Sequence, residues 1–267
     1  MSRPSPSDGF FRSRWVEAPP EVEQLDPAEL PDGFRAGAVH CGLKQDGGTD
    51  LGLVVCDEPG VSSAVLLTRN AAAAAPVRVC REMLDRDRVR AAVVNSGNAN
   101  AATGEQGIAD ALSMRDTAAS RLGFESASVA VAETGVIGVP MEMNRVLPAI
   151  EELTASLDGS GGVAFSEAIM TTDKWPKRCS LRCGGVTVSA QAKGAGMIEP
   201  GFATMLCFVQ TDAVVDRPDE ALGRAVAESF ERITVDGQMS TNDTVVLQAG
   251  GSSGAKLPDG LLDAVLL

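Results

Sequence analysis

The sequence has 267 residues, of which 44% are hydrophobic and 22% are charged, and its formal net charge is −13. This balance is typical of a globular protein whose core needs no disulfide bonds. The negative charge disfavours binding to nucleic-acid phosphates or anionic lipid, and the 4% of aromatic residues offers few surfaces on which bases could stack.

Residues 1–32 are rich in proline, serine and acidic side chains, and we expect them to form a flexible leader. No apolar run reaches the roughly 18 residues that span a bilayer, and the opening residues lack the apolar stretch of a signal peptide, so a cytoplasmic protein is expected. Short apolar runs predict strands over 51–56, 63–68, 77–80 and 89–95.

The middle of the chain begins with a helix through Ile108 and Leu122, for which Gly123 is a suitable C-cap. Further elements are predicted in chain order: a strand over 128–132, a helix over 146–157, a hairpin across Gly184-Gly185, strands over 205–210 and 244–247, a helix through 222–230, and a last helix after 257. The alternation of short strands and helices predicts a layered, mixed α/β fold.

Histidine-based catalysis is nearly excluded, because His40 is the only histidine and no G-x-S-x-G serine motif accompanies it. The six cysteines share no repeated spacing. Cys179 and Cys183 form a C-x3-C pair, but no second pair or histidine completes a zinc site. We therefore expect no metal, and we expect most of the cysteines to be buried thiols in a reducing compartment.

Five segments are unusually rich in glycine and small polar residues. They are NSGNANAATGEQG (95–107), ETGVIG (133–138), AIMTTDKWPK (168–177), KGAGMIEPGFATMLCF (193–208) and TVDGQMSTNDT (234–244). Any one of them alone is most simply a turn, and none contains a phosphate-binding or dinucleotide-binding motif.

Acyl transfer without histidine can use a threonine at a chain start, where the hydroxyl attacks and the residue's own α-amine accepts the proton. Such an amine, with a pKa of roughly 7.7–8.0, exists within a chain only after the preceding peptide bond is cut. The sequence Gly201-Phe202-Ala203-Thr204 places a small residue before a threonine. Taken alone, this is a weak signal.

In this order, the five segments resemble the ornithine acetyltransferase, or bifunctional glutamate N-acetyltransferase, family of arginine biosynthesis, from about Gly33 to the end. The resemblance implies a precursor that cuts itself between Ala203 and Thr204. An α chain (33–203) and a β chain (204–267) would then assemble into hetero-oligomers. It also implies a self-cleaving N-terminal-nucleophile fold, in which two mixed sheets are packed between helix layers.

The same resemblance implies the roles of individual residues. Thr204 would be the nucleophile, Thr134 and Gly135 would form the oxyanion hole, and Thr171 and Lys193 would bind substrate, together with Thr204. Two alternatives stay open: Thr172 or Asp173 could replace Thr171, and Lys193 could be a solvated surface charge. Asn98, Asn242 and Asp243 are expected to brace loops.

The implied reaction moves acetyl from N2-acetylornithine to glutamate through an acyl-threonine in a ping-pong sequence. It needs no cofactor, and acetyl-CoA is a second candidate donor. Glu133 departs from the family, which has a small residue there, and a carboxylate would disfavour an oxyanion unless it points away. The family continues past the end of this chain, so the β chain is expected to be truncated. The alternatives are an N-terminal-threonine amidohydrolase or aminopeptidase, and an inactive remnant.

Overall fold

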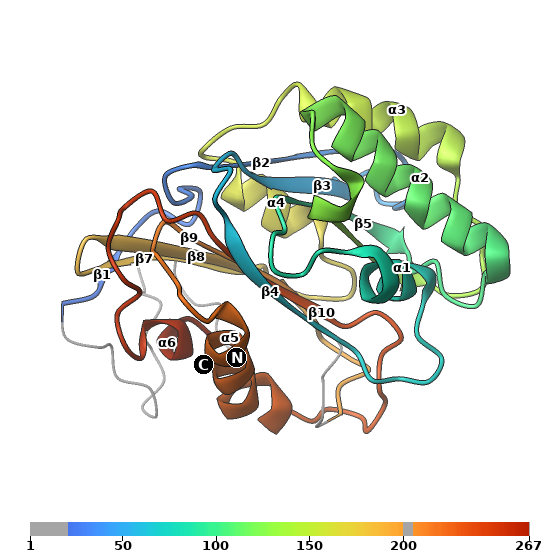
Figure 1. The fold of residues 1–267 in the computed structure, drawn as a ribbon. Coiled ribbons are helices and arrows are strands. Elements are labelled where there is room, and N and C mark those ends of the chain that lie inside the picture. Colours follow the sequence, from blue (N-terminus) through green and yellow to red (C-terminus); the bar gives the residue numbers. More distant parts are fainter. Residues whose placement is uncertain (1–20, 200–204, 267) are drawn as a thin grey trace.

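The computed structural model describes residues 21–199 and 205–266, which form two mixed β-sheets (Figure 1). Within these residues the larger sheet has the order β1 (Glu23–Gln24), β7 (Lys177–Cys183), β8 (Val186–Lys193), β9 (Leu206–Thr211), β10 (Thr244–Ala249) and β4 (Ser62–Leu67). The smaller sheet has the order β2 (Phe34–Val39), β3 (Leu51–Cys56), β5 (Ala91–Asn98) and β6 (Val129–Val136). β9 and β10 are parallel, as are β5 and β6.

Helices lie on both sides of this pair of sheets (Figure 1). The smaller sheet is covered by α2 (Gly104–Leu122) and α3 (Met143–Thr154), and the larger sheet by α5 (Pro218–Glu228) and α6 (Leu261–Leu266). α1 (Ala75–Met83) packs against α2 and β6, whereas α4 (Gly162–Ala168) contacts strands of both sheets. Two short 3-10 helices, η1 (Ser126–Ser128) and η2 (Phe230–Arg232), complete the elements. The predicted mixed α/β architecture of two sheets with helices is confirmed.

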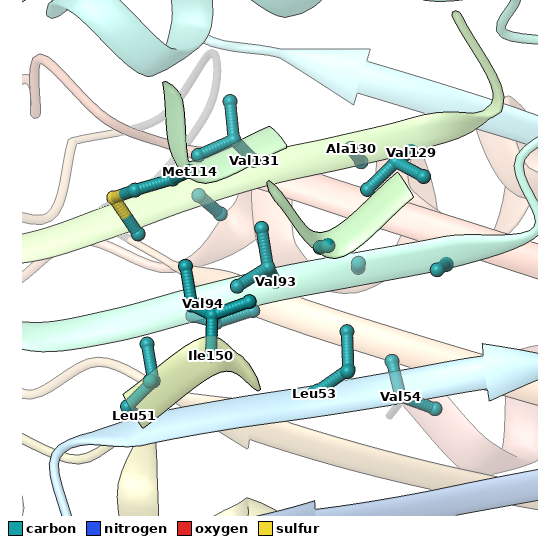
Figure 2. Close-up of a cluster of buried hydrophobic side chains, with 14 of the residues drawn as sticks. Leu51, Leu53, Val54, Val93, Val94, Met114, Val129, Ala130, Val131 and Ile150 are labelled. Atoms are coloured by element: carbon teal, nitrogen blue, oxygen red, sulfur yellow. The ribbon is translucent and has the colours of Figure 1, made fainter. Parts of the chain in front are cut away.

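The main core forms where apolar strands of the smaller sheet meet the helices above it. Val93 and Val131 of the sheet, Met114 of α2 and Ile150 of α3 are at most 1% exposed and lie together (Figure 2). These strands are nearly continuous runs of valine, leucine and alanine, because both of their faces are covered. A second core joins the larger sheet to α5 and α6.

Several predicted elements are confirmed, with bounds that shift by a few residues. α2 ends at a left-handed Gly123 with φ 69°, the conformation that glycine adopts readily at a helix C-cap. The predicted hairpin joins β7 to β8 across Gly184 and Gly185, whose φ values are +58° and +80°.

Two predictions are wrong. The run 77–80 is part of helix α1, which starts with Pro76 in its first turn and buries Val77, Val79 and Cys80. The flexible leader is wrong for residues 21–32, since β1 pairs with β7 and the N–H of Gly162 donates to the carbonyl of Ala28 (3.1 Å). Residues 1–20 lie outside the described part of the chain.

β2 and α4 were not predicted from the pattern. Among the residues that the structure describes, no helix is long and apolar enough to cross a membrane.

Candidate active site

Three strands of the larger sheet share one edge, where β8 ends and β9 and β10 begin. Lys193, the last residue of β8, is paired with Leu206, the first residue of β9, and Leu206 is paired with Thr244 of β10. The residues just outside these strands, Met205 and Asp243, are therefore brought together with Lys193. Two of the five glycine-rich and polar segments meet at this edge.

A third segment arrives from the smaller sheet. The Nζ of Lys193 donates a hydrogen bond to Oγ1 of Thr134, near the end of β6, over 3.0 Å. Both residues are buried, with exposed fractions of 3% and 8%. The structure thus brings together two of the residues that the resemblance singles out, and Lys193 is not a solvated surface charge.

Gly135 follows Thr134 in a conformation that requires glycine. Its φ is +138°, and a Cβ there would lie 2.3 Å from the carbonyl carbon of Gly97. The backbone of the β6 end therefore lies directly against that of β5, at a register irregularity around Asn98. A residue with a side chain would force these two strand ends apart.

Beside these residues lies a narrow cavity, which is lined by Thr134, Lys193, Met205, Leu206, Ser240, Asn242 and Asp243. Ala203 and Thr204, the predicted cleavage site and nucleophile, lie outside the described residues. Met205, which is covalently joined to Thr204, lines the cavity.

Burial lowers the pKa of Lys193 to about 8, although the nearby carboxylates of Asp173 and Asp243 favour its charged form. Asp243 is itself 0% exposed, and burial raises the pKa of its carboxyl to about 7. Its Oδ1 accepts a hydrogen bond from the backbone N–H of Met205 at 2.8 Å. The cavity therefore holds an acid and a base that both titrate near neutral pH, as catalytic groups often do.

Thr171 is half-buried in the bend that follows α4 and does not line the cavity. Asp173, two residues later, lies near enough for its charge to favour the charged form of Lys193. Its Oδ1 accepts from the N–H of Gly194 at 2.8 Å and from Nζ of Lys177. Burial alone would raise the pKa of Asp173, but these hydrogen bonds outweigh it and hold the pKa below its ordinary value. Whether Thr171, Thr172 or Asp173 contacts substrate stays a prediction.

Glu133 points away from the cavity. Side chains alternate along a strand, so the carboxylate of Glu133 lies on the face of β6 opposite to the hydroxyl of Thr134. There it is 0% exposed, and its Oε1 accepts from Nδ2 of Asn100 at 2.9 Å. Burial raises the pKa of Glu133 to about 8, so the side chain is mostly neutral at pH 7. The predicted conflict with an oxyanion does not arise.

The expected loop braces are confirmed. Nδ2 of Asn98 donates to the carbonyl of Val139 (3.0 Å), and the N–H of Asn242 donates to Oγ of Ser240 (3.0 Å). Asp243 braces Met205 as described above. The link from Asp173 to Gly194 and the Glu133–Asn100 pair were not predicted, because only the folded chain brings those residues together.

His40 is exposed at the end of β2, where its Nδ1 lies 2.8 Å from the carbonyl oxygen of Gly48. It does not line the cavity. All six cysteines are free thiols, and four of them are buried. Among the described residues, no three histidine, cysteine, aspartate or glutamate side chains are grouped so that they could hold a metal ion.

Known proteins resemble this chain over most of its length. It is 45% identical over 228 residues to the arginine biosynthesis bifunctional protein ArgJ of Thermosynechococcus vestitus, covering 83% of this chain and 54% of the relative. The protein of the same name from Bacillus subtilis is 46% identical over 239 residues, covering 86% and 57%. The chain thus spans a little more than half the length of these curated relatives.

Solved structures show the same likeness. The ornithine acetyltransferase of Mycobacterium tuberculosis, crystallised with ornithine, matches with a TM-score of 0.62 and 35% identity, over 69% of this chain and 100% of the crystallised chain. The arginine biosynthesis bifunctional protein of Bacillus halodurans matches with a TM-score of 0.60 and 37% identity, over 69% and 98%. The model of the ArgJ family matches residues 35–265. The chain therefore belongs to the ArgJ family.

Proposed function

We propose that this chain carries the acyl-transfer site of a glutamate N-acetyltransferase, which moves acetyl from N2-acetylornithine to glutamate. The hydrogen bond between Lys193 and Thr134 supports this best, because it joins two predicted site residues from different sheets beside Met205. Family membership and the names of the relatives point to the same chemistry. An enzyme of this kind is expected in the cytoplasm.

In the proposed reaction Thr204, freed at its amino group, attacks the acetyl carbonyl with its hydroxyl, and its α-amine takes the proton. The amide C–N bond of N2-acetylornithine then breaks, and the α-amine passes the proton to the departing ornithine nitrogen. In the second half, the amine of glutamate attacks the acyl-threonine, the ester C–O bond breaks, and the proton returns to the hydroxyl of Thr204. The hydroxyl of Thr134 and the N–H of Gly135 stabilise the negative charge on the carbonyl oxygen, each worth roughly 3–4 kcal/mol. Because Oγ1 of Thr134 accepts a hydrogen bond from Lys193, its own hydrogen is left to donate to that oxygen. Lys193 thereby strengthens one donor of the oxyanion hole.

Lys193 also provides a positive charge for an amino-acid carboxylate. Burying a charged lysine costs free energy unless the ammonium has a partner, and Lys193 is only 3% exposed. Its burial therefore favours a role in binding substrate over that of a solvated surface charge. Ornithine and glutamate both carry an α-carboxylate, so a single cation suits both halves of a ping-pong reaction. Thr171 is proposed as a further substrate contact.

Self-cleavage would use the same threonine. Its Oγ attacks the carbonyl carbon of Ala203, the C–N bond to Thr204 breaks, and the hydroxyl proton is transferred to the departing nitrogen. Water then hydrolyses the resulting ester. The match with this chain covers 100% of the crystallised Mycobacterium chain, but only 54–57% of the curated relatives. A crystallised chain that is matched in full supports a precursor that is divided into two chains. The products would stay together as a hetero-oligomer.

The test is acetyl transfer from N2-acetylornithine to glutamate by the purified chain, followed by mass spectrometry of the denatured protein. We expect the fragment that begins with Thr204 to gain one acetyl group with N2-acetylornithine alone and to lose it when glutamate is added. The same experiment with acetyl-CoA tests the second donor. Thr204→Ala should form no acyl-enzyme.

Two other outcomes separate the alternatives. Release of free acetate at a rate that glutamate does not reduce would identify an N-terminal-threonine hydrolase. Absence of any acyl-enzyme, in a chain shown to be folded by circular dichroism, would identify an inactive remnant and contradict the proposed function.

A further inference from the structure

The carboxylate of Asp50 holds a turn that lies between β2 and β3. Its side chain is 0% exposed and accepts hydrogen bonds from the backbone N–H groups of four consecutive residues. These are Cys41, Gly42, Leu43 and Lys44, at 2.6, 3.1, 2.7 and 2.9 Å. Burial would raise the pKa of this carboxyl, but the hydrogen bonds outweigh it and hold the pKa below its ordinary value. One charged side chain thus fixes the whole turn, which we call turn 41–44.

Turn 41–44 is also attached to β5 and to the end of α4. The backbone carbonyl of Asp50 accepts from the N–H of Ser96 in β5 at 2.8 Å. Nζ of Lys44 donates to the carbonyl of Ala168, the last residue of α4, at 3.4 Å. The same carbonyl accepts from Oγ of Ser96. These bonds give the turn a fixed position beside the end of β5.

The backbone of turn 41–44 lies directly against Gly97. The φ of Gly97 is +106°, and a Cβ there would lie 2.9 Å from both the carbonyl carbon and the carbonyl oxygen of Leu43. Gly97 in turn lies against Gly135, which is its partner in the ladder of β5 and β6. Close-packed groups transmit a displacement to their neighbours. A shift of Leu43 is therefore felt at Gly97 and then at Gly135.

The strand ladder alone holds this end of β5 weakly. Its register with β6 is irregular around Asn98, which is paired with both Thr134 and Val136. An irregularity of this kind disrupts the hydrogen bonds of a ladder locally. The packing of turn 41–44 therefore contributes to where the end of β6 lies.

We propose that Asp50 is a positioning residue for the oxyanion hole, and that it acts through the contacts from Leu43 to Gly97 and from Gly97 to Gly135. The inference rests on the proposed function, in which Gly135 donates its N–H to the negatively charged oxygen. Asp50 does not line the cavity. Its loss should therefore change the geometry of a donor and leave the binding of substrate nearly unaffected.

Asp50→Asn is the most conservative change that weakens the turn. It keeps the size of the side chain, but one of the two oxygens becomes an NH2 group that cannot accept a hydrogen bond. Three of the four N–H groups donate to Oδ2 and one donates to Oδ1, so at least one bond is lost in either orientation of the amide.

The chain offers a matched control in Asp212, which follows β9 at the end away from the cavity. It is 5% exposed, and its Oδ1 accepts from the backbone N–H of Thr187 at 2.8 Å. Asp212→Asn therefore makes the same chemical change at another buried carboxylate that holds a backbone N–H. Any loss that the two variants share reports stability alone.

The first test measures kcat and KM for acetyl transfer in wild type, Asp50→Asn and Asp212→Asn. We expect Asp50→Asn to lower kcat about 10-fold with KM changed less than about twofold, because a displaced oxyanion donor costs part of the roughly 100–1,000-fold that its removal costs. Asp212→Asn should keep both constants. Equal kcat values in the two variants, or a loss confined to KM, would overturn the inference.

Nuclear magnetic resonance and hydrogen exchange test the inference apart from activity. The amide signal of Gly135 should move in Asp50→Asn and stay in place in Asp212→Asn. The amide of Lys44 should exchange at least about 10-fold faster in Asp50→Asn, as expected when its acceptor is weakened. If wild type transfers no acetyl, the proposed function fails. The inference fails separately if the Gly135 signal of Asp50→Asn matches that of wild type.

Gly97→Ala tests the same contacts from the other side, and it decides the matter if Asp50→Asn does not fold. Its methyl group must displace the carbonyl of Leu43. We expect the amides of turn 41–44 to exchange faster and kcat to fall, again with little change in KM. A Gly97→Ala protein with the kcat and the exchange rates of wild type would overturn the inference.

Discussion

The charge of Lys193 is the residue-scale property on which the proposed substrate binding depends most. Because burial lowers its pKa to about 8, the ammonium is present below that pH and is lost above it. In the proposed reaction an anionic substrate binds only to the charged form. The free α-amine of Thr204 must instead be neutral, and amines of this kind have a pKa of roughly 7.7–8.0. The two requirements oppose each other.

We therefore expect KM for glutamate to rise as pH increases through 8, about 10-fold per unit, while kcat rises with pH up to the same region. Together they give a bell-shaped dependence of kcat/KM. Lys193→Arg retains its charge at all these pH values, so its KM should stay flat even if kcat is lower. A wild-type KM that is constant from pH 7 to pH 10 would contradict this role of Lys193.

Glu133 predicts a pH effect on stability. Burial raises its pKa from 4.5 to about 8 in the folded chain. Between these pH values the unfolded chain has lost the proton and the folded chain keeps it, so the free energy of unfolding falls by up to about 1.4 kcal/mol per pH unit. The stabilisation is complete below pH 4.5 and lost by pH 8.

Glu133→Gln keeps an acceptor for Asn100 and does not titrate. Urea denaturation at several pH values should show that wild type loses stability relative to Glu133→Gln between pH 5 and pH 8. A difference between the two proteins that stays constant over this range would show that Glu133 titrates normally in the folded state.

At the scale of elements, one side chain of α4 packs between the two sheets. Phe165 is 0% exposed and meets the edge of Phe208 of β9, with ring centroids 5.3 Å apart and an interplanar angle of 80°. Gly52 of β3 makes room for it, since a Cβ there would lie 2.8 Å from the ring. The helix thus packs into a space that a missing side chain leaves in β3.

We expect Phe165→Ala to lower the free energy of unfolding by about 3–5 kcal/mol, because it leaves a cavity between the sheets. Urea denaturation measures the change, and Phe165→Leu should show a smaller loss. A loss below about 1 kcal/mol for the alanine variant would mean that Phe165 does not pack between the sheets in this way.

Local sequence patterns predicted those elements whose structure depends mainly on their own residues. The apolar run of β3, the glycine pair of the β7–β8 hairpin and the Gly123 cap are examples. The pattern of α1 led to the wrong prediction of a strand, because Val77 and Val79 alternate with polar residues as in a strand. Pro76 instead lies in the first turn of a helix. β2 was not predicted, since its Gly37 and neighbouring alanines give little apolar contrast.

The site was predictable only in part. The resemblance singled out Thr134 and Lys193, which the structure brings together. The hydrogen bonds of Asp173 and Asp243 to backbone N–H groups depend on contacts between distant segments, which no local pattern encodes. The burial that shifts the pKa of Lys193 likewise arises only when both sheets are assembled.

For the whole molecule, the predicted cut would fall between two strands of one sheet. β9 and β10 follow the cut, yet β9 pairs with β8 and β10 pairs with β4, both of which precede it. We expect the two fragments to stay bound, so size-exclusion chromatography in native buffer should give one peak that contains both. Fragments that elute separately without denaturant would contradict this arrangement of strands.

The most direct measurement is the mass of the denatured protein, taken from a preparation that transfers acetyl. We expect two fragments in wild type, the smaller of which begins with Thr204 and ends at Leu267, and a single uncut chain in Thr204→Ala. An active wild-type preparation that contains only the uncut 267-residue chain would contradict catalysis by a threonine paired with its own freed amine.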